Sequence, residues 1–142
     1  MASFHITSLY AGLLGLFLVV LSFNMTKSWI KAASQGVSGD PARASSAAQA
    51  LRRAEALVGS FTDYVPLTLL LIGLAESGGA PAAVIHGLGA ALVAARLMHA
   101  FGSNFIHGAD ALRFLGAQLT YLVLTIASFI CLCLYWVPML TH

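Results

Sequence analysis

Charged side chains are scarce in this sequence of 142 residues, where Asp, Glu, Lys and Arg together make up only 8%. A soluble domain carries about a quarter charged residues, so this chain has too few to give a globule a water-facing surface. Apolar residues, in contrast, make up 59%. Lipid must therefore replace water around part of the molecule, and at this length we expect one domain.

Cysteine is also scarce, since Cys131 and Cys133 are the only two and stand two positions apart in an apolar run. On a helix this spacing places the two side chains about 200° apart, so a disulfide between them is not expected. Two thiols also provide too few ligands for a metal site. We interpret the pair as small apolar side chains and expect no metal.

Motifs of soluble enzymes are missing, including a phosphate-binding glycine loop and a nucleophile elbow. We interpret Gly87 and Gly89 as positions that allow close helix packing. The net charge of +2 provides no exposed basic face, so nucleic-acid binding is not expected. The first apolar run has neither a basic segment before it nor a small-residue cleavage site after it, so we expect it to remain as a membrane span.

Four apolar runs each approach the ~20 residues that a membrane-spanning helix needs. The expected spans are residues 4–30, 47–77, 82–102 and 111–138, with loops at 32–46 and 103–110 and a turn at 77–81. A bundle in water would need a polar stripe along each helix, but residues 67–74 and 121–134 are apolar all round. We predict an all-α integral membrane four-helix bundle that forms a single domain over residues 1–142.

The positive charges gather on one side of this predicted bundle. All seven lie in or beside the loops at 32–46 and 103–110: Lys27, Lys31, Arg43, Arg52, Arg53, Arg96 and Arg113. Cytoplasmic loops carry an excess of Lys and Arg, so both loops are predicted to face the cytoplasm. Both termini are then expected on the opposite side of the membrane.

Several polar residues fall within the predicted spans, where an ionisable group costs about 2.5–3.5 kcal/mol. Helical spacing places Arg53, Ser60 and Asp63 on one face of the second span. Arg53 and Asp63 are separated by about 15 Å along the axis, so they can border one polar groove but cannot pair. A cytoplasmic anchor for Arg53 is the alternative, whereas the deeper Asp63 indicates a functional or inter-helix role.

In the third span, Arg96 and His99 are three residues apart and share a face. A histidine among apolar residues is usually a packed, hydrogen-bonded side chain, and the neighbouring Arg96 makes an anion site the alternative. Arg113 begins the fourth span and could instead be an interfacial anchor. Lys27, Arg53, Arg96 and Arg113 are expected at a similar depth, where they would repel one another unless an anion joined them. This arrangement predicts a site for a small polyanion that enters from the cytoplasm.

Two segments resemble signatures of the MAPEG superfamily, the membrane-associated proteins of eicosanoid and glutathione metabolism. Residues 52–67, with Asp63-Tyr64-Val65-Pro66, resemble the second-helix signature, in which Arg, Asn and Glu stand at helical spacing before a Pro. Residues 95–102 resemble the third-helix Arg-x-x-His motif. Leu9-Tyr10, the Gly-Asp pair in the first loop and Glu76 also match small bacterial members. The resemblance covers essentially the whole chain.

The resemblance implies a homotrimer in a bacterial inner membrane, surrounded by lipids, that binds glutathione as a co-substrate between neighbouring subunits. Its implied activity is that of a glutathione transferase or peroxidase acting on lipophilic electrophiles or hydroperoxides. Arg113 would lie beside the sulfur, Arg53 and Arg96 would hold carboxylates, and His99 would orient Arg96 or contact the peptide. The remaining expected binding residues are Lys27, Ser60 and Asp63.

The chain departs from these signatures at positions that bear on activity. Ser60 replaces an Asn, Asp63 replaces a Glu and Ser103 replaces a Tyr, while Ala56 and Val58 stand where the family has an inner Arg and His. A non-enzymatic lipid- or anion-binding protein of the same fold is therefore the alternative. A small drug–proton exporter is a third hypothesis, but its coupling carboxylate would lie in the first helix, and residues 4–30 contain none.

Overall fold

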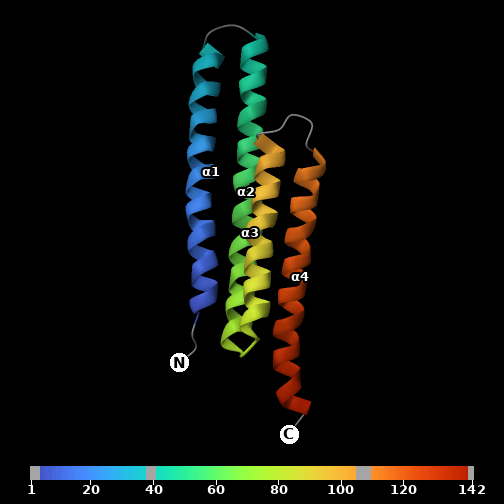
Figure 1. The fold of residues 1–142 in the computed structure, drawn as a ribbon. Helices are drawn as coiled ribbons and strands as arrows, with labels where there is room; N and C mark the ends of the chain where they lie inside the picture. Colours follow the sequence, from blue (N-terminus) through green and yellow to red (C-terminus); the bar gives the residue numbers. More distant parts are fainter. Residues whose placement is uncertain (1–3, 38–40, 105–109, 141–142) are drawn as a thin grey trace.

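The computed structural model describes residues 4–37, 41–104 and 110–140, which form four helices (Figure 1). These are α1 (His5–Val37), α2 (Pro41–Ser77), α3 (Ala82–Asn104) and α4 (Asp110–Leu140). Each helix contains a stretch long and apolar enough to cross a membrane. The predicted all-α membrane fold with four spanning helices is confirmed.

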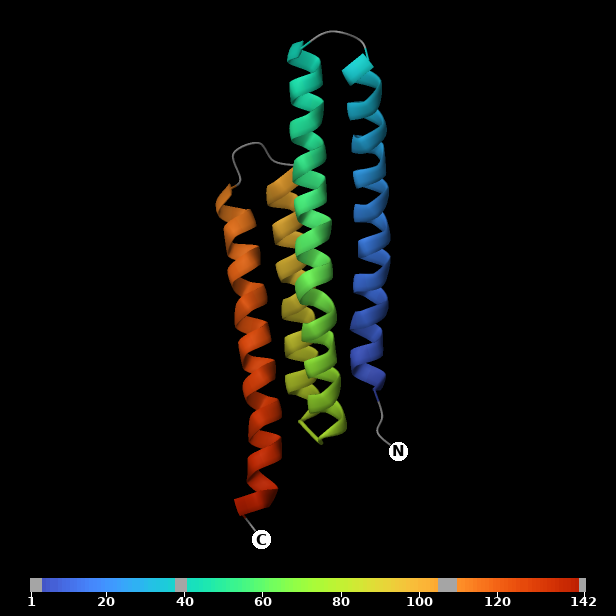
Figure 2. The same ribbon diagram turned by 180° about the vertical axis from the view of Figure 1, so that it is seen from behind.

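The helices run alternately up and down, with α1 packed against α2 and α3 packed against α4. Helix α2 contacts all three other helices, whereas no contact joins α1 to α4 within the described residues. The view from behind shows the two termini at the same end of the bundle (Figure 2). Because the chain has four helices that alternate in direction, it begins and ends at the same end of the bundle.

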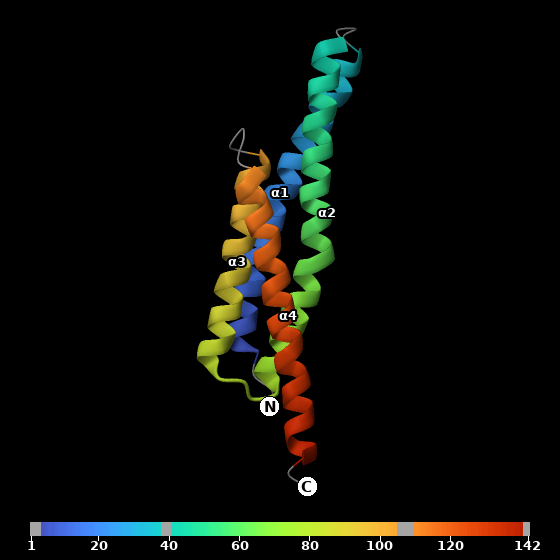
Figure 3. The same cartoon turned by 90° about the vertical axis from the view of Figure 1, so that its right-hand side faces the viewer.

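The first connection is shorter than the sequence predicts. The loop expected at residues 32–46 is wrong for most of its length, because α1 continues to Val37 and α2 begins at Pro41. Alanine is abundant in this segment and has the strongest helix propensity, while proline is favoured in a first helical turn. As a result, α1 and α2 extend beyond α3 and α4 at this end (Figure 3).

The second expected loop, residues 103–110, falls largely outside the described residues. Helix α3 ends at Asn104 and α4 begins at Asp110, while residues 105–109 are not described. The side chains of Arg43 and Ser103 are likewise outside the described part of the chain.

The turn predicted around Gly79 is confirmed, since Gly79 has a φ of 90°, a left-handed conformation that favours glycine.

Apolar side chains lie both inside the bundle and on its outer surface. Leu14, Ile72 and Leu92 are almost completely buried, whereas Leu16 is 70% exposed and Phe23 is 66% exposed. Large exposed apolar surfaces mark contact with a membrane or another protein. The outer faces of the four helices are therefore suited to lipid.

Two glycines allow neighbouring helices to touch. A Cβ atom at Gly116 would lie 2.5 Å from the backbone nitrogen of His99 and 2.6 Å from the carbonyl oxygen of Ala95. The backbone of α4 therefore lies directly against that of α3 at this point. Gly89 accommodates the ring of Tyr10, as the close-packing interpretation predicts, whereas Gly87 faces open space.

At the end of the bundle that carries the termini, Glu76 of α2 caps the first turn of α1. Its carboxylate accepts hydrogen bonds from the backbone N–H groups of Ile6 at 2.9 Å and Thr7 at 2.8 Å. The hydroxyl of Thr7 donates a third bond at 2.5 Å. The first N–H groups of a helix have no partner within the helix, so Glu76 satisfies two of them and ties α1 to α2.

Candidate functional site

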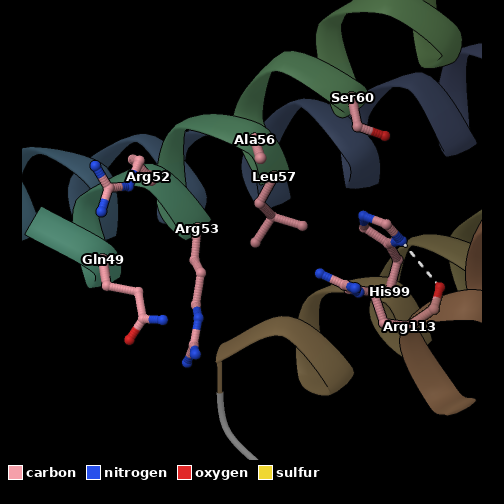
Figure 4. A pocket seen from close by; sticks show the side chains of 8 residues that line it. All are labelled: Gln49, Arg52, Arg53, Ala56, Leu57, Ser60, His99 and Arg113. Atoms are coloured by element: carbon pink, nitrogen blue, oxygen red, sulfur yellow. Dashed lines mark hydrogen bonds between the residues drawn. The ribbon is translucent and has the colours of Figure 1, made fainter. Parts of the chain in front are cut away.

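A cavity of about 430 Å³ lies near the end of the bundle opposite the termini, between α2 and the ends of α3 and α4 (Figure 4). Its walls come from three helices. The lining residues are Gln49, Arg52, Arg53, Ala56, Leu57, Ser60, His99 and Arg113. Three of these eight side chains are arginines and none is a carboxylate, so the cavity is strongly positive.

Helix α2 supplies one wall of the cavity. Arg53, Ala56 and Ser60 recur at intervals of three and four residues, which places them on one face of a helix. Figure 4 shows Arg53 extending from α2 toward the side of the cavity formed by α3 and α4. Asp63, one turn beyond Ser60, is exposed and does not line the cavity.

His99 of α3 is tied to the first turn of α4. Its Nδ1 atom lies 3.1 Å from the carbonyl oxygen of Arg113, as the dashed line in Figure 4 shows. Because a carbonyl oxygen can only accept, His99 donates from Nδ1, and in the neutral ring Nε2 is then an acceptor. Together with the close approach at Gly116, this bond fixes the end of α4 that carries Arg113.

Arg96 lies behind the cavity wall instead of lining it. Its side chain is only 3% exposed, and its Nη1 atom donates to both the carbonyl oxygen and the hydroxyl oxygen of Ser60, each at 3.2 Å. The guanidinium carbon lies 5.7 Å from the centre of the Phe61 ring and 5.9 Å from that of Tyr64, within cation–π range. Within the described residues, Nε and Nη2 of Arg96 have no hydrogen-bond partner.

The structure therefore brings together four of the residues predicted to form the site, namely Arg53, Ser60, His99 and Arg113. Arg96 contacts this group through Ser60. Lys27 is exposed on α1 and does not line the cavity.

Four lining residues are not among those predicted from the sequence, namely the polar Gln49 and Arg52 and the apolar Ala56 and Leu57. Gln49 precedes Arg53 by four residues, so the helical spacing that links Arg53 to Ser60 also extends to Gln49. The expected span began only at residue 47, which left Gln49 and Arg52 at the outer end of the helix. The continuation of α2 to Pro41 gives both residues a fixed place in the wall.

A model of a known protein family, described as the MAPEG family, matches residues 7–133 of the chain. The match extends from the first turn of α1 to the second half of α4 and includes every residue that lines the cavity. No curated protein and no solved structure matches the chain.

Proposed function

The chain belongs to the MAPEG family, whose members include glutathione-dependent transferases and peroxidases, and we propose that it uses glutathione against lipophilic electrophiles or hydroperoxides. The observation that carries this proposal is the cavity with three arginines and no carboxylate. Glutathione has two carboxylates and one amino group, so it is a net anion at neutral pH. A cavity of this charge at the end of an apolar bundle favours such a guest.

We propose that the arginines of α2 bind the carboxylates of glutathione. A guanidinium holds a carboxylate through two parallel hydrogen bonds, which supplies both affinity and orientation. Arg53 extends into the space between the helices, and Arg52 and Gln49 lie toward the outer end of the same wall. The amide of Gln49 can donate to and accept from a peptide group, which suits the backbone of glutathione.

Arg113 is the residue that we assign to the sulfur. A free thiol has a pKa of about 8.5, so only a few per cent is thiolate at neutral pH. A guanidinium beside the sulfur stabilises the anion and lowers that pKa. In the transferase reaction, the thiolate forms a bond to the electrophilic carbon and the leaving group departs with its electron pair. In the peroxidase reaction, two glutathione molecules become a disulfide as the hydroperoxide is reduced to an alcohol and water.

The second substrate is proposed to arrive through lipid. Leu67 and Leu70 of α2 and Phe114 and Leu115 of α4 are exposed apolar side chains on two helices that form the cavity. Lipophilic molecules concentrate in the bilayer, so binding beside the thiolate replaces a slow encounter in water. The gathering of Lys and Arg at this end supports a cytoplasmic location for the cavity and for both connecting segments. We propose that this membrane is a bacterial inner membrane.

We further propose that three copies form a homotrimer and that glutathione lies between neighbouring copies. This arrangement is supported by the two expected binding residues that lie outside the cavity of one chain, Lys27 and Asp63, both of which are exposed. A neighbouring copy could present them to the guest. It would also shield Asp63, whose carboxylate would otherwise face lipid at a high energetic cost.

The activity is tested with the full chain reconstituted into lipid vesicles with glutathione and a hydrophobic electrophile. We expect turnover in the native chain, and a loss of about tenfold or more in kcat for Arg113→Ala, with partial rescue by Arg113→Lys. Lys31→Ala, which changes an exposed cation that does not line the cavity, serves as the control. Turnover no greater than that of Arg113→Ala would contradict the proposal.

One observation favours a second candidate, an anion- or lipid-binding protein without catalysis. Ala56 lines the cavity at the position where the family signature has an inner arginine, so the site has one cation fewer near its centre. Binding of glutathione in a calorimetric titration without turnover of any electrophile would support this candidate over the enzyme.

A further inference from the structure

The hydroxyl of Ser60 is hydrogen-bonded in an unusual way for a membrane-spanning helix. Most other serine and threonine hydroxyls of the described helices donate back to a carbonyl of the preceding turn, as Thr62, Thr68 and Thr125 do. Ser60 makes no such bond within the described residues, and its oxygen instead accepts from Arg96. A hydroxyl has one hydrogen to donate. That hydrogen is therefore available to a guest, because Ser60 lines the cavity.

The charge behind Ser60 is not neutralised by the protein around it. Arg96 is buried, and no carboxylate within the described residues forms an ion pair with it. The ionisable side chains that line the cavity near it are also basic, namely Arg53 from α2, His99 from α3 and Arg113 from α4. A charge in a region of low dielectric acts more strongly on its neighbours than one in water. The cavity floor at Ser60 therefore favours an anion.

We propose that Arg96 and Ser60 form a relay, in which the buried guanidinium polarises the hydroxyl and the hydroxyl donates its hydrogen to an anionic group of the guest. Ser60 is then a binding residue, and Arg96 is a positioning residue that contributes its charge without touching the guest. Hydrogen bonds in such a chain strengthen one another. This role differs from the direct carboxylate contact that the sequence predicts for Arg96. The identity of the guest as glutathione rests on the proposed function, whereas the relay itself does not.

The relay can be tested without glutathione by placing a thiol at the hydroxyl position. In a chain carrying Cys131→Ala and Cys133→Ala, Ser60→Cys positions a sulfur where the Arg96 guanidinium now lies 3.2 Å from the hydroxyl oxygen. The rate of alkylation by iodoacetamide is measured against pH on the full chain in detergent. The matched control is Thr62→Cys, which changes an exposed hydroxyl on the same helix that does not line the cavity.

We expect the pH of half-maximal alkylation for Ser60→Cys to lie about one unit or more below that for Thr62→Cys, because a nearby guanidinium favours the thiolate. Adding Arg96→Met should abolish the difference, and Arg96→Lys should retain part of it. Equal profiles for Ser60→Cys and Thr62→Cys would overturn the relay. This comparison needs no change at Arg96, so it can overturn the relay even where Arg96→Met fails to fold.

The glutathione-dependent activity and the relay from Arg96 through Ser60 can be disproved independently of each other. A lowered profile in a chain that never turns over glutathione would support the relay with another anion as guest and would count against the proposed function. Turnover of glutathione in a chain whose Ser60→Cys profile is unshifted would overturn the relay and leave the proposed function in place.

Discussion

The arginines at this site differ in their surroundings, and the difference assigns them different tasks. Arg53 and Arg113 line the cavity with exposed side chains, so both can contact a guest directly. Arg96 is buried between α2 and α3 and reaches the cavity through its bond to Ser60. Arg53 lies on the wall that we assign to the carboxylates, whereas Arg113 is held by the bond from His99. Their substitutions should therefore affect different kinetic constants.

Replacing Arg53 with alanine should raise KM for glutathione and leave kcat nearly unchanged. A charge-assisted hydrogen bond contributes about 1.5–3 kcal/mol, which corresponds to a rise in KM of about 10- to 150-fold. Steady-state kinetics with varied glutathione measure both constants. A fall in kcat with an unchanged KM would show that Arg53 acts on the sulfur and not on a carboxylate.

Helical spacing predicts which residues of one helix line the site, and the shared depth of the basic residues predicts that His99 of α3 and Arg113 of α4 join them. Spacing along α2 links Arg53 to Ser60, and both do line the cavity. Spacing cannot show that Asp63 lies outside it, because the position of α4 relative to α2 depends on packing. The bond from Arg96 to Ser60 joins residues 36 positions apart, and no local pattern encodes it.

At the level of helices, the contact between α3 and α4 depends on one small residue. Gly116 allows the α4 backbone to reach His99 and Ala95, and the next turn toward the N-terminus carries Arg113.

The sequence predicts the spans well, because about 20 apolar residues are needed to cross a bilayer. Hydropathy does not show where a helix ends in water, so it does not predict the continuation of α1 and α2 over most of residues 32–46.

Gly116→Ala should force α3 and α4 apart and lower the stability of the chain. Overpacking a close contact costs about 1–3 kcal/mol, and here the added Cβ would meet backbone atoms that cannot rotate away. The thermal unfolding midpoint in detergent should fall. Gly59→Ala is the control, since nothing lies within 4 Å of a Cβ at that position. Equal midpoints for the two variants would contradict the close contact at Gly116.

Glu76→Ala should loosen the start of α1, because the N–H groups of Ile6 and Thr7 would lose their acceptor. Loss of a helix cap costs about 0.5–2 kcal/mol. Hydrogen exchange at residues 5–8 should quicken, with little change in α3. Glu55→Ala removes an exposed carboxylate from the same helix and should leave this exchange unaltered. Unchanged protection in Glu76→Ala would exclude the capping role.

For the whole molecule, the distribution of charge predicts on which side of the membrane the two termini lie. All seven Lys and Arg residues fall in the half of a helix nearer the two connections, toward the end opposite the termini. Positive charge is retained on the cytoplasmic side, so the cavity should open there and both termini should face away. Alkaline phosphatase fused after His142, which is active only outside the cytoplasm, should therefore be active. Fluorescence of a green fluorescent protein fused at the same point would indicate the opposite orientation.

Calorimetric titration of the full chain in detergent measures whether the arginine-lined cavity binds glutathione. We predict saturable binding to the native chain, unchanged affinity in Lys31→Ala, and a loss of about 100-fold or more in the double variant Arg53→Ala and Arg113→Ala, since two charge-assisted contacts are removed. Absence of binding to the native chain, or equal affinity in the double variant, would show that this cavity is not a glutathione site.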